Sequence, residues 1–200
     1  LALLASVTFA QEHKPATVVP AMDLAPMKAN SYNWFGRHDA AAARVKQGNV
    51  DLLLIGDSIT HGWGGSPDEN RYGGPGGLYD KYFGGRNAVN LGFGWDRTQH
   101  VLWRFNHGEI DSISPKAAVV MIGTNNIGVD SSDDIAAGVT AIIDQLQAKL
   151  PKTKILLLGI FPRSHEPTDK ARIQVGEVNQ RISSLGKRRG VTYLDLGDRK

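Results

Sequence analysis

A serine that could act as a nucleophile lies in the segment 56–60, Gly-Asp-Ser-Ile-Thr. This segment directly follows residues 50–55, an apolar run with a single acid, which is typical of a strand buried on both faces of a parallel sheet. At such a strand end the hydroxyl of Ser58 could attack an ester carbonyl, whose oxygen then becomes negative. Gly-Asp-Ser is also a common turn, so the segment alone gives weak support.

Two further polar clusters each follow another apolar run. They are residues 90–96, Asn-Leu-Gly-Phe-Gly-Trp-Asp, and residues 123–126, Gly-Thr-Asn-Asn. Each has a plainer interpretation, because Gly92 and Gly94 could serve only a tight turn with positive φ and the second cluster could be a simple loop. The carboxyl ends of parallel strands meet at one edge of a sheet, however, so the three clusters are expected to converge there. This convergence predicts a site.

Strands and helices alternate along the chain and must position these clusters. The expected strands cover residues 50–55, 88–91, 117–122, 154–160 and 191–194. The expected helices cover residues 39–47, 78–83, 98–105, 132–150 and 170–188, and in the last of them Ile173, Val178, Ile182 and Leu185 are expected to face inward. The alternation predicts an α/β domain of three layers (α/β/α) with a flavodoxin-like parallel sheet.

Composition narrows the classes of function. The chain has 200 residues, which suits one domain, and 41% of them are hydrophobic. The net charge is +3 without a basic stripe interleaved with aromatics, so no nucleic-acid partner is expected. There is no cysteine, which excludes disulfides and thiolate chemistry. The sequence also lacks a phosphate-binding P-loop and the Gly-x-Ser-x-Gly elbow of the α/β-hydrolases.

The N-terminal residues resemble an export signal. Residues 1–10 are apolar and small, and Thr8-Phe9-Ala10 before Gln11 has the pattern of a cleavage site, which predicts a partial signal peptide and a secreted or periplasmic protein. The alternative is a short buried helix or strand. The run is too short to span a membrane, so no stable membrane insertion is expected. Residues 11–31, with three prolines, are expected to be a linker or extended arm before a domain over 32–200.

On these clusters the chain resembles the SGNH (GDSL-type) hydrolases, especially those of the platelet-activating-factor acetylhydrolase catalytic-subunit type. Residues 55–60, 90–104 and 120–126 carry the resemblance, which extends from about Trp34 to Leu196. Within that type the chain is similar to secreted bacterial esterases associated with sugar-ester deacetylation. The resemblance implies the SGNH hydrolase fold and ester hydrolysis.

The family implies a role for each cluster. Ser58 is the expected nucleophile, Asn125 the side-chain donor to the oxyanion, and a backbone N–H of the second cluster the other donor. Trp95 holds that second position, where the family usually has glycine, so its N–H can donate and its ring could form a wall of the acyl or sugar pocket. The expected supporting residues are Asp57, Gly92, Gly94, Asp96 and Gly123.

Asp57 and Asp96 could also suggest a metal site or an acid–base pair. We expect both instead, together with Thr60, to bind loop backbone around the serine. No metal and no cofactor are expected.

A serine nucleophile needs a base, normally a histidine held by a carboxylate. The family supplies both from a late Asp-x-x-His segment, and this sequence has none: no histidine follows an aspartate by three residues, and neither Asp195 nor Asp198 substitutes. We therefore expect the base and its orienting acid beyond Lys200, in a domain incomplete at its C-terminus. His61 is expected to line the pocket entrance and His165 to lie in a mobile loop. The other histidines are His13, His38, His100 and His107, of which the last two are expected on the surface or packed between helices.

The sequence thus predicts a serine ester hydrolase for small acyl esters, with O-acetyl groups on carbohydrate as the expected substrate. One alternative is a non-catalytic carbohydrate-binding protein on the same scaffold, with Trp63, Trp95 and Trp103 as sugar-stacking surfaces, although core packing is the favoured role of Trp103. Another is a lipase or thioesterase of the same family. The partner is expected to be a small-molecule or carbohydrate ester, and the oligomeric state stays open.

Overall fold

The computed structural model describes residues 14–22, 32–65 and 78–197. The predicted signal peptide at 1–10, most of the predicted arm at 11–31 and the middle of the glycine-rich stretch lie outside these residues. Along the described residues, no helix is both long and apolar enough to cross a membrane.

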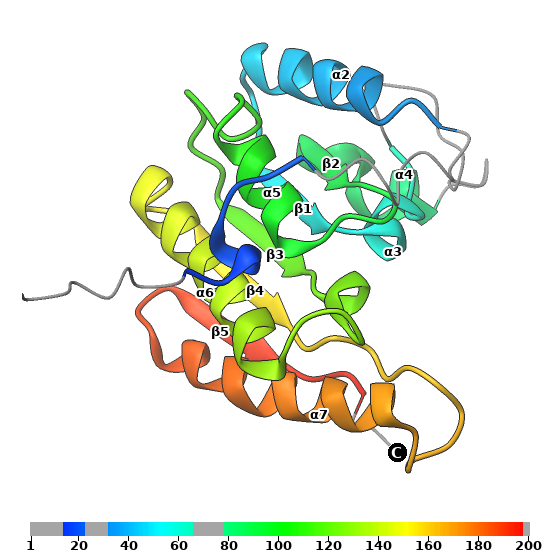
Figure 1. Ribbon diagram of the computed structural model, residues 1–200. Helices are drawn as coiled ribbons and strands as arrows, with labels where there is room; N and C mark the ends of the chain where they lie inside the picture. The colour runs from blue at the N-terminus through cyan, green and yellow to red at the C-terminus, as the bar shows by residue number, and fades with distance from the viewer. Residues whose placement is uncertain (1–13, 23–31, 66–77, 198–200) are drawn as a thin grey trace, which may run out of the picture.

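A five-stranded parallel sheet forms the centre of the fold (Figure 1), in the order β2-β1-β3-β4-β5. Its strands are β1 (Leu52–Gly56), β2 (Ala88–Gly92), β3 (Ala117–Met121), β4 (Lys154–Leu158) and β5 (Val191–Leu194). All four pairings are parallel, which confirms the predicted α/β class. One face of the central strands is almost completely buried under helices and carries Leu53, Ile55, Val120, Ile155 and Leu157. On the other face, Leu52, Val119, Leu156 and Leu158 are only half-buried.

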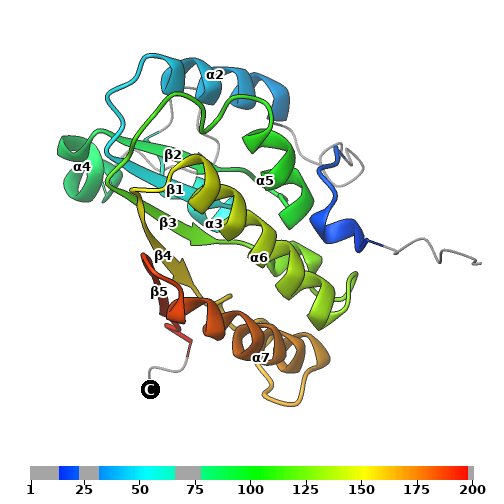
Figure 2. The same cartoon turned by 90° about the vertical axis from the view of Figure 1, so that its left-hand side faces the viewer.

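Helices cover the sheet. They are α2 (Trp34–Lys46), α3 (Ser58–His61), α4 (Leu78–Phe83), α5 (Thr98–Phe105), α6 (Ser132–Lys149) and α7 (Lys170–Ser183), with short 3-10 turns η1 (Ala16–Val18), η2 (Gly84–Arg86), η3 (Thr124–Asn126) and η4 (Ser184–Lys187). Figure 2 shows α5 and α6 on one face of the sheet and α4 on the other. Buried residues of α2, α5, α6 and α7 join those of the sheet in one hydrophobic core.

Two helix boundaries differ from the prediction by more than one residue. The helix expected from residue 39 begins at Trp34, because the side chain of Asn33 accepts a hydrogen bond of 2.9 Å from the Gly36 N–H and caps it. The last helix ends at Ser183 and continues as η4. The prediction that Ile173 faces inward is wrong, since 49% of it is exposed, whereas Val175 of the same helix is buried.

The described part of the N-terminal arm packs onto two helices. Thr17 is completely buried, and its hydroxyl donates a hydrogen bond of 2.6 Å to the carbonyl oxygen of Asp134 in α6. The hydroxyl of Thr98, at the start of α5, donates to the Thr17 carbonyl oxygen at 3.0 Å. A Cβ atom at Gly138 would lie 2.9 Å from that same oxygen, so the glycine makes room for the arm.

Candidate active site

Strand register brings the three sequence clusters to one edge of the sheet. Gly56, the last residue of β1, pairs with Gly92 of β2 on one side and with Met121 of β3 on the other. The loops after these strands therefore start at the same level. The first bond beyond the strands runs from the Phe93 N–H to the Gly56 carbonyl oxygen at 3.0 Å. The predicted convergence of the clusters thus follows from the sheet itself.

The first loop places Ser58 at the start of a short helix. Asp57 caps α3, and its carboxylate accepts a hydrogen bond of 2.9 Å from the Ile59 N–H. Ser58, the first residue of the helix, is half-buried, whereas Asp57 is buried. Burial raises the pKa of Asp57 to about 6, although the Ile59 N–H and the charge of Arg163 oppose the rise.

Two glycines let this helix lie against the strand ends. A Cβ atom at Gly92 would lie 2.2 Å from the backbone nitrogen of His61, and one at Gly56 would lie 2.2 Å from the hydroxyl oxygen of Thr60. Neither position has room for a side chain. The glycines at these strand ends therefore determine how closely α3, and with it Ser58, approaches β2.

The second loop is a tight turn with an unusual residue. The Asp96 N–H donates to the Phe93 carbonyl oxygen at 3.2 Å, and Trp95 has φ of 67°. Turns of this kind favour glycine at the position with positive φ, and another residue there costs about 1–2 kcal/mol. The alternative in which Gly92 or Gly94 supplies the positive φ is wrong, because neither has it. The strain falls on Trp95, whose side chain is 45% exposed.

Asp96 anchors this turn through side chains. Its carboxylate accepts hydrogen bonds from the Trp34 indole N–H at 2.8 Å and from the Arg104 Nε at 2.9 Å. The expectation that it binds loop backbone is therefore wrong. Asp96 is completely buried, and burial raises its pKa to about 7 against the opposing charge of Arg104.

A buried polar network continues from Asp96 into the core. The Arg104 guanidinium also binds the Glu109 carboxylate, and the other Glu109 oxygen lies 2.8 Å from the Nδ1 of His38. Two buried guanidinium groups lie over the ring of Phe93, with Arg104 at 3.9 Å and Arg37 at 5.0 Å from the ring centroid. This network links α2, α5 and the second loop.

Arg37 and Arg104 also hold the end of β2 by its backbone. Arg37 donates to the carbonyl oxygens of Gly92 and Asn90, and Arg104 donates to that of Leu91. Sequence reasoning did not predict these two arginines as residues that support the site. The only indication in the sequence was the position of Arg104, near the end of the predicted helix that follows the second cluster.

The third loop brings in two asparagines with different surroundings. Gly123 begins it with φ of 121°, a conformation that suits glycine. The side-chain amide of Asn125 donates to the Asp96 carbonyl oxygen at 2.9 Å, which leaves one amide hydrogen for another acceptor. Asn126 is completely buried, and it accepts from the Thr98 N–H at 3.2 Å and donates to the Asp130 carboxylate at 2.9 Å.

The loops together present donors suited to a negative oxygen. Within residues 14–22, 32–65 and 78–197, no acceptor takes the N–H of Trp95 and no residue binds the hydroxyl of Ser58. The N–H of Ser58 belongs to the first turn of α3, where helical N–H groups lack intrahelical partners. The described residues contain no group of three or more side chains that could hold a metal ion.

The histidines lie elsewhere. His61 is completely buried, with its ring edge-on to Tyr32 at 5.4 Å, so the expectation that it lines the pocket entrance is wrong. Burial, with a smaller contribution from Arg37, lowers the pKa of His61 to about 3. The side chain of His165 is 99% exposed beside Glu166.

The other described histidines belong to helices or their ends. His38 and His100 are buried, whereas His107 is exposed and stacks on Trp103 with 3.6 Å between ring centroids. Among the described residues, no histidine is hydrogen-bonded to Ser58.

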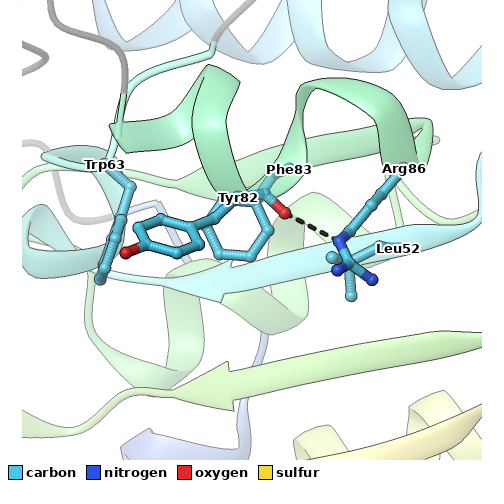
Figure 3. A pocket seen from close by; sticks show the side chains of 5 residues that line it. All are labelled: Leu52, Trp63, Tyr82, Phe83 and Arg86. Carbon is cyan, nitrogen blue, oxygen red and sulfur yellow. Dashed lines mark hydrogen bonds between the residues drawn. The ribbon is translucent and has the colours of Figure 1, made fainter.

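A separate pocket of about 510 Å³ is formed in part by residues of α4 and η2. Its walls are Leu52, Trp63, Tyr82, Phe83 and Arg86. Figure 3 shows Trp63 at one end and Arg86 with Leu52 at the other, and the Arg86 Nε donates to the Tyr82 carbonyl oxygen at 2.8 Å. None of these residues belongs to the three clusters.

Comparisons with known proteins agree with this architecture. The family model described as "GDSL-like Lipase/Acylhydrolase family" matches residues 54–200. The chain is 33% identical over 164 residues to platelet-activating factor acetylhydrolase IB subunit alpha2 of Rattus norvegicus, an alignment that covers 82% of this chain and 66% of that protein. The chain thus spans just under two thirds of the length of such curated relatives.

Solved structures share the fold at lower identity. An acetylxylan esterase from Geobacillus stearothermophilus, solved as a catalytic mutant, aligns with a TM-score of 0.58 at 19% identity, covering 74% of this chain and 76% of that one. A carbohydrate acetylesterase from Sinorhizobium meliloti aligns with a TM-score of 0.58 at 16% identity, covering 75% and 85%. The parallel sheet, its three strand-end loops and the family match define a class: the chain belongs to the GDSL-like lipase/acylhydrolase family.

Proposed function

We propose that the protein is a serine ester hydrolase that removes small acyl groups, in particular O-acetyl groups from carbohydrate. Membership of the acylhydrolase family supports the reaction class. The curated relatives are named acetylhydrolases, and structures with the same fold include esterases of acetylated xylan and other carbohydrates, which supports acetyl as the acyl group and a sugar as its carrier.

The register of the three strand ends carries this proposal. It holds the start of α3 with Ser58, the turn with Trp95 and the loop with Asn125 at one level of the sheet. In the proposed reaction the Ser58 hydroxyl oxygen attacks the ester carbonyl carbon, and the carbonyl oxygen becomes an oxyanion. The N–H groups of Ser58 and Trp95 and the free amide hydrogen of Asn125 then donate to that oxygen. Each such donor contributes about 3–4 kcal/mol of transition-state stabilisation.

The positive φ of Trp95 has a part in this arrangement. Trp95 occupies the left-handed region within the turn that the Asp96 N–H closes onto the Phe93 carbonyl oxygen. The Asp96 carbonyl, one residue later, meanwhile holds the Asn125 amide. The two donors are thus fixed to the same short turn. Replacing the usual glycine by tryptophan retains the backbone donor.

We assign no general base among the described residues. His61 is buried and has a strongly lowered pKa, and His165 lies on an exposed loop. In line with the family resemblance, we propose that an Asp-x-x-His segment beyond Lys200 removes the proton of the Ser58 hydroxyl and returns it to the leaving alcohol.

The experiment compares the full-length protein with its Ser58→Ala variant in hydrolysis of p-nitrophenyl acetate. Ser58 is half-buried, so the variant is expected to fold normally and to lose at least about 10³-fold in kcat. Circular dichroism and the urea midpoint serve as folding controls. Undiminished turnover in a folded variant would refute the assignment of the nucleophile.

A carbohydrate-binding protein without catalysis is the second candidate. The observation that favours it is that no described histidine binds Ser58, while two tryptophans, Trp63 and Trp95, are 43% and 45% exposed. It predicts that the full-length protein binds acetylated oligosaccharides and releases no acetate from them. Acetate release that depends on Ser58 would exclude it.

We also propose that the protein is exported, because residues 1–10 have the composition and cleavage pattern of a signal peptide. N-terminal sequencing of the protein from the culture medium and periplasm is expected to give Gln11 as the first residue. An uncleaved N-terminus in the cytoplasmic fraction would contradict export.

A further inference from the structure

We propose that the indole of Trp95 is the surface on which the sugar ring of the ester substrate stacks. This inference rests on the proposed ester hydrolysis and adds the residue that selects the alcohol part of the substrate. It begins from the backbone of Trp95, whose φ of 67° lies in the region that tryptophan rarely adopts. Strain of this kind persists where the surroundings enforce it and is concentrated at functional sites.

The surroundings of the turn enforce its conformation without help from the indole. The Tyr32 hydroxyl donates to the Gly94 carbonyl oxygen at 2.9 Å, and the Asp96 N–H closes the turn onto Phe93 at 3.2 Å. The Asp96 carboxylate is held by Trp34 and Arg104. With glycine at position 95, the turn could keep all these hydrogen bonds with less backbone strain. The turn therefore does not explain the tryptophan.

Burial does not explain it either. Trp34, the neighbouring tryptophan of the same network, is 3% exposed, and its packing against Phe93 and Trp103 accounts for its presence. Trp95 is 45% exposed. A strained backbone that carries a half-exposed indole gains little from the core. Neither the turn nor burial among the described residues accounts for the tryptophan, and we assign its ring to contact with the substrate.

The place of the ring fits a substrate that reaches the oxyanion donors. Trp95 is one residue before Asp96, whose carbonyl oxygen holds the Asn125 amide at 2.9 Å. An ester whose carbonyl oxygen accepts from Asn125 and from the Trp95 N–H must lie beside the Trp95 side chain. A short acyl group is recognised in an enclosed pocket, which an exposed ring does not provide. The exposed face of the indole therefore suits the alcohol part of such an ester.

Charge favours a sugar over a cationic alcohol such as choline. The face of an indole attracts both C–H groups of sugar rings and ammonium groups, because it is electron-rich. The Arg163 side chain, however, donates to the Thr124 carbonyl oxygen at 2.6 Å, next to Asn125. Its positive charge at this strand edge repels a cation and accommodates a neutral or acidic sugar. The alcohol part is therefore a sugar ring.

The test measures kcat/KM of the full-length protein for an acetylated xylotetraose and for ethyl acetate, whose alcohol part has no ring. Trp95→Ala and Trp95→Gly are expected to lower the ratio of the two values at least tenfold, and Trp95→Phe to restore it to within threefold of wild type. Alanine keeps the strained φ while glycine relieves it, so equal ratios in these two variants assign the effect to the ring. Tyr82→Ala, which removes an exposed aromatic ring in the separate pocket, is the control and should keep the wild-type ratio.

A proportional loss on both esters, or an unchanged ratio in all variants, would overturn the inference. Calorimetry in a Ser58→Ala background separates it from the proposed function. There, Trp95→Ala is expected to bind the acetylated xylotetraose at least tenfold more weakly. Equal affinities would overturn the sugar contact, whereas absence of ester hydrolysis in the wild type with intact sugar binding would refute only the catalytic proposal.

Discussion

The side-chain amide of Asn125 donates a hydrogen bond of 2.9 Å to the backbone carbonyl oxygen of Asp96, and so joins the loop after β3 to the loop after β2. The Asp96 carboxylate is itself fixed by Trp34 and Arg104. The orientation of the asparagine therefore depends on a buried network that begins in α2 and ends in α5. A donor held in this way needs no rearrangement when an oxyanion forms, which is the condition for strong electrostatic stabilisation.

Asn125→Ala is expected to lower kcat for p-nitrophenyl acetate by about 10²–10³-fold, because it removes one oxyanion donor. KM should change much less, since the donor acts mainly on the transition state. Steady-state kinetics with the two constants determined separately check this. A rise in KM alone would show that Asn125 binds the ground state instead.

The neighbouring Asn126→Ala is expected to act on stability. Asn126 is buried and connects the Thr98 N–H to Asp130, so its removal leaves buried groups unpaired and costs about 1–3 kcal/mol. The free energy of unfolding in urea measures the loss. A urea midpoint equal to that of the wild type would contradict the structural role.

Arg104→Met is expected to destabilise the protein by about 3–5 kcal/mol, because it leaves the buried carboxylates of Asp96 and Glu109 without their cation. The matched control is Arg181→Met, which breaks the surface pair with Asp133 and should leave the urea midpoint nearly unchanged. Similar urea midpoints for the two variants would contradict the expectation that the buried network stabilises the fold.

The shifted pKa of Asp57 makes its contribution to the free energy of unfolding depend on pH. Burial raises its pKa from 3.8 to about 6, so between these values the native state keeps a proton that the unfolded state has released. Its contribution is complete below pH 3.8 and is lost as the pH rises through about 6. The contribution of Asp57 to the free energy of unfolding should therefore fall with rising pH in this window, by an amount on the order of 3 kcal/mol.

Asp57→Asn tests this dependence, because the amide oxygen can still accept from the Ile59 N–H but does not titrate. Urea unfolding at several pH values should show a flatter profile between pH 4 and pH 6 in the variant. Profiles of equal slope would assign the dependence to another group.

Gly92→Ala is expected to destabilise the fold by at least about 3 kcal/mol, because its Cβ atom would lie 2.2 Å from the His61 nitrogen and the backbone of α3 would have to move. Gly176→Ala in α7 is the opposite control: no atom lies within 4 Å of its Cβ, and alanine should stabilise the helix by about 0.5–1 kcal/mol. Thermal unfolding of both variants compares them. Equal shifts would mean that the packing of α3 on β2 is not decisive.

Much of this fold follows from local sequence patterns. The strand predicted at 191–194 has the observed bounds, and the strand predicted at 88–91 is one residue shorter than β2. Apolar runs of strand length predict such elements because each strand buries its own side chains. The start of α2 was missed because it depends on Asn33 as a cap inside a stretch with little periodicity. The exposure of Ile173 and the burial of Val175, two residues later, show that a helical period alone does not fix where the buried face begins.

The part of the site that could be predicted is the part that follows from the order of strands and clusters along the chain. The carboxyl ends of parallel strands meet at one edge of a sheet, so the sequence alone predicts that the three clusters lie together. The turn that contains Trp95 is anchored by bonds from Asp96 to Arg104 and to Trp34, and Trp34 lies far away in the sequence. Periodicity contains no information on such contacts. The burial of His61 under Tyr32 is unpredictable for the same reason.

The contacts of the N-terminal arm constrain the order in which parts of the fold can form during synthesis. Thr17 is among the first described residues to leave the ribosome, yet its hydroxyl bonds to Asp134, made more than a hundred residues later. The three strands that hold the site, β2, β1 and β3, are complete by Met121, before that partner exists. The strand ends can therefore assemble first as the chain emerges. The arm around Thr17 can pack onto α5 and α6 only after α6 has been synthesised.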